Sequence, residues 1–298
     1  MSGPVLVTGS SGFVGLHLVP ALMQRGRDVR GLVRKSERGA PLKAAGAEIV
    51  VGDLLDPSSL ARAVQGCSAV IHLAAVADSS DPDLNERVNV GGSRSLARAC
   101  SDAAVPRILN ISSTCAGRKL QDAYGETKQR AEHEFEIEGL EVTHLRPTMI
   151  YGLGSKEFDL FSGVIRRAPR VPIPGDGTSV LRPVFVHDAV ELLLRILDRD
   201  DTAGRTYDVA GPETISFNDF IGAVGRAMGR STKPLHVPAA VALAGARLLG
   251  RVMEHPPINV DQVMAFLQDT EVDIEPARRD LGWAPRPLDE GLAELFGD

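Results

Sequence analysis

The chain of 298 residues carries 33 Lys and Arg against 39 Asp and Glu, a net charge of −6, and 43% of its residues are hydrophobic. This composition and length suit a large buried core. The Lys and Arg residues are scattered, which argues against the clustered basic field that a nucleic-acid partner requires. Any anionic ligand must therefore be held by local groups.

Cysteines, apolar runs and histidines bear on location and metal content. The three cysteines form no Cys-x-x-Cys pair, which favours a disulfide-free protein. We find neither a signal peptide nor a run long enough to span a membrane, and we interpret the apolar stretch 237–250 as a packed helix. The seven histidines lack metal-ligand spacing, so we assign no metal. We expect a cytoplasmic protein with neither a nucleic-acid nor a membrane partner.

The first half of the chain alternates short β-branched runs with helical patterns. Strands that read as continuous apolar runs are typical of a parallel sheet covered on both faces. The pattern predicts an α/β fold with a doubly wound parallel sheet of the Rossmann type. The expected strands lie at 4–9, 29–34, 47–53, 69–75, 107–113 and 141–147, and the helices at 13–26, 58–66, a stretch ending near Ala104, and 122–138.

After Pro147 the pattern changes to Gly- and Pro-rich loops at 170–183 and then mostly to helices, at 216–229, 261–269 and 288–296. Two later segments, 182–198 and 206–211, still look like sheet and helix of the first half. We therefore predict two interleaved domains. Residues 1–150, rejoined by about 183–211, form the dinucleotide-binding domain, and 151–182 with 212–298 form a smaller, mostly helical substrate lobe.

The segment VLVTGSSGFVGLHL places Gly9, Gly12 and Gly15 between the first strand and the first helix. The first glycine allows the tight turn, the second lets backbone approach a pyrophosphate, and the third lets the helix pack closely on the strand. The helix N-terminus supplies N–H groups and partial positive charge to phosphates. A glycine-rich turn without a ligand is the alternative, but the flanking strand and helix favour a dinucleotide site.

The end of the second strand bears on which dinucleotide binds. Sites for NAD(H) place an acidic residue there to bind the adenosine ribose. This chain has Val33 in that position, followed by Arg34 and Lys35, which suit a 2′-phosphate. We therefore favour NADP(H) over NAD(H); the alternative is that the two cations begin a solvated loop. Asp53, at the end of the third strand, is placed to meet the adenine.

The segments TGSSGFVG, GDLLD, HLAA, NVGGS, NISS, YGETK and LRPTMIYG occur in this order, and the chain resembles the extended branch of the short-chain dehydrogenase/reductase family. NAD(P)-dependent sugar epimerases and dehydratases, 3β-hydroxysteroid dehydrogenases and dihydroflavonol reductases belong to that branch. The resemblance covers nearly the whole chain. It is specific for fold and cofactor class and weak for substrate.

The resemblance implies that Tyr124 is the general acid/base and that Lys128 contacts the nicotinamide ribose and lowers the pKa of the tyrosine. The physical argument agrees, because a spacing of four places both side chains on one helical face and an ammonium beside a phenol favours phenolate. Ala131 and Phe135 continue this face, which we expect to be buried against the sheet. The alternative is an ordinary surface tyrosine and lysine.

A hydroxyl before Tyr124 would complete the catalytic set. The resemblance implies that Ser113 donates to the substrate oxygen, with Ser112 and Thr114 as alternatives, or that these residues only cap the strand end. In the sugar-modifying relatives a longer insertion separates this hydroxyl from the tyrosine, whereas here the two are eleven residues apart. The short gap predicts a more open site or a different substrate.

Two departures narrow the chemistry. The 4,6-dehydratases place an Asp-Glu pair after the catalytic hydroxyl, where this chain has Thr114 and Cys115, so dehydration is disfavoured. Epimerases commonly hold the nucleotide diphosphate with an Arg, and Arg182 lies near that place but one residue too close to Asp188.

His72 and Asn89 match positions that face the cofactor, although a single histidine is more often a core residue.

The expected site residues follow from the motifs and the resemblance together. The catalytic set is Tyr124, Lys128 and Ser113, and the candidate substrate contacts are Ser113, Thr114 and Arg182. The expected cofactor contacts are Gly9, Ser11, Gly12, Phe13, Val14, Gly15, Arg34, Lys35, Asp53, Leu54, Leu73, Ala74, Ala75, Asn89, Ile111, Tyr124, Lys128 and Pro147.

Several functions remain open at this level. The first is an NAD(P)-dependent oxidoreductase acting at a secondary alcohol or ketone, with a nucleotide-sugar 4-epimerase among its forms. The second is an NADPH-dependent ketone reductase of the hydroxysteroid-dehydrogenase kind. The third is a non-catalytic dinucleotide-binding module resembling the accessory subunit of respiratory complex I, which the retained Tyr and Lys disfavour. We expect a small-molecule substrate, with a nucleotide sugar as one candidate, and consider a homodimer through the helix 122–138.

Overall fold

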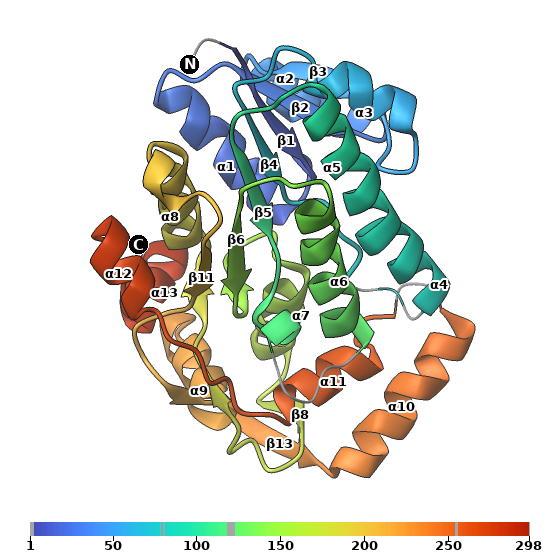
Figure 1. Cartoon of the computed structure of the whole chain (residues 1–298). Helices are drawn as coiled ribbons and strands as arrows, with labels where there is room; N and C mark the ends of the chain where they lie inside the picture. The colour runs from blue at the N-terminus through green and yellow to red at the C-terminus, as the bar shows by residue number, and fades with distance from the viewer. Residues whose placement is uncertain (1–2, 78, 80, 118–122, 254–255, 298) are drawn as a thin grey trace.

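The computed structural model describes residues 3–77, 79, 81–117, 123–253 and 256–297. At its centre is a seven-stranded parallel sheet in the order β11-β6-β5-β4-β1-β2-β3 (Figure 1). Chain order reverses between β1 and β4, which is the switch point where ligands bind in such sheets. The predicted doubly wound α/β fold is therefore confirmed. The strands are β1 (Val5–Thr8), β2 (Val29–Val33), β3 (Glu48–Val51), β4 (Ala69–His72), β5 (Ile108–Ile111), β6 (Val142–Pro147) and β11 (Thr206–Val209).

Helices cover both faces of this sheet. Helices α3, α5 and α6 pack on one face, and α1 and α8 on the other (Figure 1). Ala131 and Phe135 are buried, as the helical spacing predicted. The α-helices of this part are α1 (Phe13–Gln24), α2 (Ala40–Ala44), α3 (Pro57–Val64), α4 (Pro82–Asn85), α5 (Gly92–Asp102), α6 (Ala123–Ile137) and α8 (Val186–Leu197). Three short 3₁₀ helices, η1 (Ser36–Gly39), η3 (Thr114–Gly117) and η4 (Asp200–Thr202), and one π-helix, η2 (Glu86–Gly91), accompany them.

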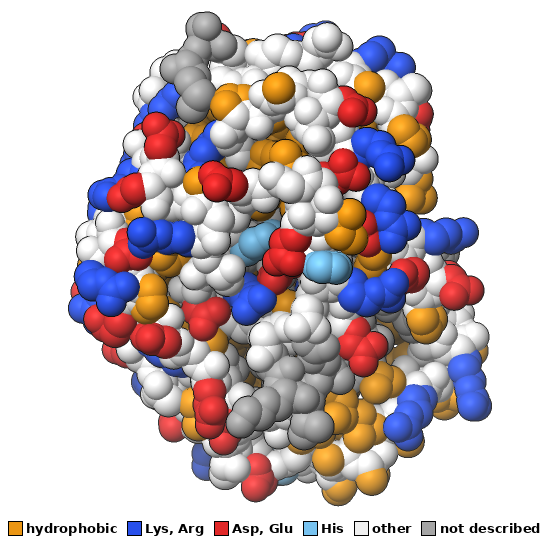
Figure 2. Space-filling view, viewed as in Figure 1, with side chains coloured by type: hydrophobic (Ala, Val, Ile, Leu, Met, Phe, Trp, Pro, Cys, Tyr) orange, Lys and Arg blue, Asp and Glu red, His pale blue; other side chains and the backbone are white. Residues whose placement is uncertain are grey.

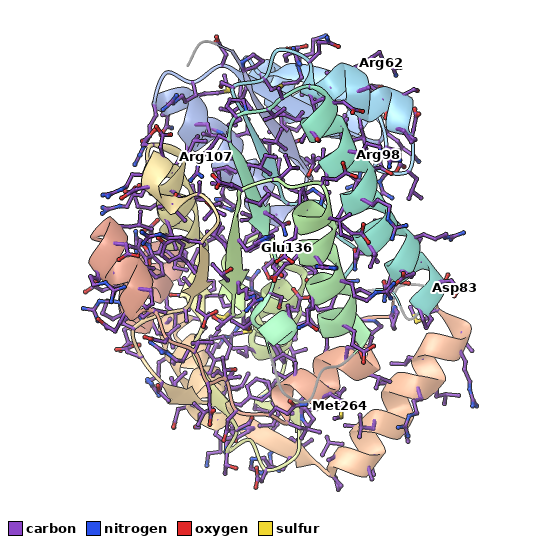
Figure 3. All side chains as sticks on the ribbon, viewed as in Figure 1. Arg62, Asp83, Arg98, Arg107, Glu136 and Met264 are labelled. Carbon is purple, nitrogen blue, oxygen red and sulfur yellow. The ribbon has the colours of Figure 1, made fainter. Side chains whose placement is uncertain are left out.

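Long-range contacts bring residues after Pro147 back to the sheet. Strand β11 pairs with β6, and α8 packs on α1. Arg107, labelled in Figure 3, donates to the main-chain oxygen of Ile196 at 3.0 Å and so joins the start of β5 to α8. The late segment 206–209 thus forms an edge strand of the first domain's sheet.

Most of the remaining elements lie at the end of the molecule toward which the strands point, whereas α12 lies beside β11 and α8 (Figure 1). The segment 170–183, expected as loop, instead contains β8 and β9, because each pairs with a strand more than thirty residues later in the chain. The strands are β7 (Ile150–Tyr151), β8 (Arg170–Pro174), β9 (Val180–Leu181), β10 (Val184–Phe185), β12 (Ile215–Ser216) and β13 (Lys233–Val237), and the helices α7 (Lys156–Arg167), α9 (Phe217–Ala227), α10 (Ala239–Val252), α11 (Val260–Phe266), α12 (Glu275–Leu281) and α13 (Leu288–Phe296).

Helix α10 corrects one expectation from the sequence. The apolar stretch around it is helical and contacts α11, but it is mostly exposed, since Ala246 is the one buried residue among its 14, all of which are described. Apolar composition predicts burial only where another element covers the helix, and here the surface is left open. Among the described residues, no helix combines the length and apolar character needed to cross a bilayer.

Candidate active site at the carboxyl ends of the strands

The turn between β1 and α1 has the geometry of a phosphate cradle. Gly9 has φ +67°, and a Cβ there would lie 2.8 Å from the nitrogen of Ala74. A Cβ on Gly15 would lie 2.5 Å from the carbonyl oxygens of Gly9 and Ser10. Gly12 is exposed at the N-terminus of α1. Two of the glycines thus let the turn fold tightly against β4 and α1, and the third leaves the helix N-terminus accessible to a phosphate.

Arg34 and Lys35 follow β2 at the same edge of the sheet. Both side chains are exposed, as is that of Arg38 in the next turn. Strands β2 and β3 pair in register from Arg30 to Val33, so Asp53 lies beside this basic segment. The Asp53 carboxylate accepts from the backbone N–H of Leu55 at 2.9 Å. The three cations are therefore accessible to an anionic group bound at the end of β2.

The residues after β4 form a loop that Asn89 fixes in place. The Asn89 amide oxygen accepts from the backbone N–H of Val76 at 2.8 Å, and its amide nitrogen donates to the Val76 carbonyl at 2.9 Å. The same nitrogen lies 3.3 Å from the hydroxyl of Thr127 in α6. Asn89, expected to face the cofactor, here holds the loop 73–77 to the helix that carries Tyr124.

His72 is a core residue, as the sequence interpretation preferred. Its Nδ1 lies 2.7 Å from the Thr8 hydroxyl and its Nε2 lies 3.2 Å from the Ser93 hydroxyl. Burial, and to a lesser degree the charge of Lys128, lowers the pKa of His72 to about 3. The ring is therefore neutral at physiological pH and links β1, β4 and α5.

Lys128 lies buried against the end of β5. Its side chain is 3% exposed, and Nζ donates to the main-chain oxygen of Ile111 at 2.7 Å. Burial lowers the pKa of Lys128 to about 8, and the nearby Glu132 carboxylate partly opposes this shift. Tyr124 lies one helical turn earlier on the same helix and is partly exposed. The two residues are therefore on adjacent turns of α6, at the carboxyl ends of the strands.

The serine and threonine at the end of β5 differ in what their hydroxyls do. Thr114 donates to the main-chain oxygen of Pro147 at 3.3 Å. The Ser113 hydroxyl instead accepts from the backbone N–H of Cys115 at 3.2 Å, so its proton is left for another acceptor. Ser112 is buried. The hydrogen bonds thus favour Ser113 over Thr114 as the hydroxyl that can donate to a substrate oxygen.

A buried ion pair that the sequence analysis missed supports this helix. Arg146 of β6 donates to both carboxylate oxygens of Glu132, at 2.9 and 2.6 Å. Although burial raises the pKa of Glu132, the Arg146 guanidinium brings it below its usual range. Glu132 is thus ionised one turn beyond Lys128. The sequence could have indicated Glu132 as a residue of this site, because it follows Lys128 by four residues and so lies on the same face of the helix.

Arg182, expected near a substrate phosphate, is held by main-chain groups. Its two terminal nitrogens donate to the carbonyl oxygens of Val272 and Gly211, each at 2.9 Å. These bonds join the residue after β9 to the segment that follows β11 and to the segment that precedes α12. Neither of these hydrogen bonds connects Arg182 to Tyr124 or Lys128.

Comparisons with known proteins show the family of the chain. The model of the NAD dependent epimerase/dehydratase family matches residues 5–210, and the chain belongs to this family. It is 28% identical to a UDP-glucose 4-epimerase of Vibrio cholerae, covering 99% of this chain and 94% of that protein. It is 30% identical to a 3 beta-hydroxysteroid dehydrogenase/Delta 5-->4-isomerase of Mycobacterium tuberculosis, covering 95% and 86%. The resemblance to the extended short-chain dehydrogenases/reductases is therefore confirmed.

Solved structures give the same result. MoeE5, in complex with UDP-glucuronic acid and NAD, has a TM-score of 0.79 and 26% identity, covering 99% of this chain and 98% of that one. The chain is an NAD(P)-dependent enzyme of this family, as predicted.

Proposed function

We propose that the protein transfers hydride between NAD(P) and a secondary alcohol or ketone, with Tyr124 as the acid/base and Ser113 as donor to the reacting oxygen. When bound, the dinucleotide supplies or accepts the hydride at its nicotinamide. In the reducing direction Tyr124 gives its phenolic proton to the carbonyl oxygen as the carbon accepts hydride. In the oxidising direction the phenolate takes the hydroxyl proton.

The observation that carries the proposal is the burial of the Lys128 ammonium one turn from Tyr124. A cation held in a dry site strengthens the electrostatic preference for phenolate over phenol. The bond from Nζ to Ile111 uses one of its three protons, which leaves two for a ribose and the tyrosine. The glycine turn after β1 lies at the same carboxyl edge of the sheet and fits a pyrophosphate.

We further propose that NADP(H) is preferred to NAD(H). The support is the exposed set of Arg34, Lys35 and Arg38 at the end of β2, where no carboxylate occupies the position of Val33. MoeE5 is solved in complex with NAD, so the cofactor preference of this chain would differ from that relative's.

Between the two reaction modes, we propose a ketone reductase or alcohol dehydrogenase that exchanges its cofactor at each turnover. The Arg182 guanidinium would have to give up two main-chain hydrogen bonds to reach a nucleotide diphosphate. Curated relatives named for such chemistry include a ceramide reductase of Caulobacter vibrioides, 32% identical over 64% of this chain.

A nucleotide-sugar 4-epimerase is the second candidate, favoured by the full-length match to the Vibrio cholerae enzyme. An epimerase keeps its cofactor, because it returns the hydride to the same substrate. Heat-denaturing the purified protein and assaying the supernatant for dinucleotide separates the two. Stoichiometric release would contradict the reductase, and its absence together with ketone-dependent NADPH oxidation would support it.

We also propose a cytoplasmic location and a homodimer formed through α6. The outer face of α6 carries exposed charged residues such as Glu136, which suit either solvent or a polar interface. Light scattering on the purified protein measures the mass directly, and a monomeric mass would rule out the dimer.

A further inference from the structure

Helix α10 presents apolar side chains away from the protein. Val241, Leu248 and Val252 are 60%, 62% and 74% exposed. Because they are spaced by seven and four residues, they lie in one stripe along the helix, and the buried Ala246 lies on the opposite side. A surface helix ordinarily has the reverse arrangement, with its apolar face turned inward. We define Val241, Leu248 and Val252 as the outer stripe.

The residues next to the outer stripe are also exposed and apolar. Leu235 in β13, which leads into α10, is 44% exposed, and Met253 at its end is 43% exposed. Figure 2 shows hydrophobic side chains gathered at the lower right of the view, where Figure 1 draws α10, with Lys and Arg side chains beside them. The apolar surface therefore extends beyond the helix at both ends.

Charge is segregated in the same part of the chain. Residues 220–253 contain five Lys and Arg and no Asp or Glu, in a protein of net charge −6. Arg247 and Arg251 lie on α10 itself, are exposed, and are one turn apart between the outer stripe and the pocket that α10 forms with α4 and α11, which both arginines line. Apolar side chains flanked by arginines match a layer of hydrocarbon beneath anionic phosphates.

We infer that α10 docks the enzyme on an anionic membrane surface, lying in the plane of the interface. Its 14 residues span about 21 Å, too short to cross the hydrocarbon but sufficient to lie along it. The outer stripe enters the boundary between headgroups and acyl chains, and Arg247 and Arg251 meet lipid phosphates. This inference departs from the sequence expectation of no membrane partner, which rested on the lack of a spanning segment, because an interfacial helix does not have to span the bilayer.

A second copy of the chain would be the other natural cover for an apolar helix. The charges favour the membrane, since pairing α10 with itself brings Arg247 and Arg251 near their own copies and offers no acidic residue of the helix to balance them. The family model ends at residue 210, so this helix lies outside the part that defines the family.

Docking through α10 would bring the catalytic end of the sheet close to the bilayer. A pocket of about 350 Å³ opens between α4, α10 and α11, and Figure 3 labels Asp83 on α4 and Met264 on α11. Asn259, in the wall of this pocket, donates to the main-chain oxygen of Ala77 at 3.4 Å. Ala77 follows Val76, which is bonded to Asn89, and Asn89 in turn contacts Thr127 on the helix of Tyr124. One loop thus separates the pocket from the catalytic helix.

The test is flotation of the full-length protein with vesicles of phosphatidylcholine alone and of phosphatidylcholine with an equal part of phosphatidylglycerol. We expect binding to the anionic vesicles that weakens with salt, and little binding to the neutral ones. The double variant Leu248→Ser with Val252→Ser should bind roughly tenfold or more weakly. The matched control is Ile137→Ser, which alters a residue 63% exposed on α6 and should bind like the native protein.

A second variant separates charge from apolar contact. Arg247→Glu with Arg251→Glu should abolish the preference for anionic vesicles. Absence of flotation, or equal flotation of the outer-stripe variant and the native protein, would overturn the inference. So would a dimer by light scattering that the outer-stripe variant converts to a monomer. Tyr124→Phe should float like the native protein, so this test is independent of hydride transfer.

Discussion

The Nζ of Lys128 donates to the main-chain oxygen of Ile111 at 2.7 Å, which joins α6, the helix that carries Tyr124, to the end of β5. This bond fixes the lysine in a buried position and orients its remaining protons. Burial also lowers its pKa to about 8, close enough to neutrality for its protonation to be measurable.

The shifted pKa of Lys128 predicts how stability depends on pH. Between about 8 and the ordinary lysine value of 10.5, the unfolded chain binds a proton at this residue that the folded chain has lost. The free energy of unfolding contributed by Lys128 should therefore rise with pH through this window. Urea unfolding of the native protein and of Lys128→Met at several pH values isolates the effect. The difference between them should change across the window; a constant difference would contradict the shift.

Gly15 should tolerate no side chain. A Cβ would lie 2.5 Å from two carbonyl oxygens of the phosphate turn, so Gly15→Ala should displace the turn and weaken dinucleotide binding by roughly tenfold or more. Gly245→Ala is the control, because it is also helical and meets nothing within 4 Å. Fluorescence titration with NADPH measures both. Native affinity in Gly15→Ala would show that the turn does not hold the cofactor.

The ion pair of Glu132 with Arg146 should contribute to stability mainly as a matched pair. Arg146→Met leaves a buried carboxylate without its partner and should lower the free energy of unfolding by about 3 kcal/mol or more. The double variant with Glu132→Gln should recover part of this loss, because neither charge is then left alone. Equal stability of the single and double variants in urea would argue against coupling between the two residues.

Arg34 should discriminate between the two dinucleotides. Arg34→Ala should raise the KM for NADPH roughly tenfold to a hundredfold, as expected for the loss of a charge-assisted hydrogen bond, and change the KM for NADH little. Arg62, an exposed arginine on α3, gives the control variant Arg62→Ala. If Arg34→Ala affected both dinucleotides equally, the proposed contact with a 2′-phosphate would be wrong.

The sequence predicted those parts of the molecule whose determinants are local. Three of the four residues of β1 are apolar and all four are buried, and the spacing from Tyr124 to Phe135 correctly indicated an inward face of α6. Glycine at positions 9 and 15 is required by close backbone contacts within the same turn and the neighbouring strand. Such features leave a trace in a short window of sequence.

Contacts between distant segments could not be predicted in this way. Arg182 lies near the expected motif, yet its partner Val272 is 90 residues away, so no local pattern reveals the bond. The apolar residues of α10 likewise indicate a helix but not whether another element covers it. The pairing of β8 with β13 turned an expected loop into sheet for the same reason.

The proposed reaction depends most directly on the phenol of Tyr124. The decisive measurement is the rate of NADPH oxidation with a panel of ketones, in the native protein and in Tyr124→Phe, together with NADPH affinity and thermal unfolding of both. We predict a rate lower by about a hundredfold to ten-thousandfold in the variant, with unchanged affinity and stability. A native rate in Tyr124→Phe, on a ketone that the native protein reduces, would contradict the assignment of Tyr124 as the acid/base.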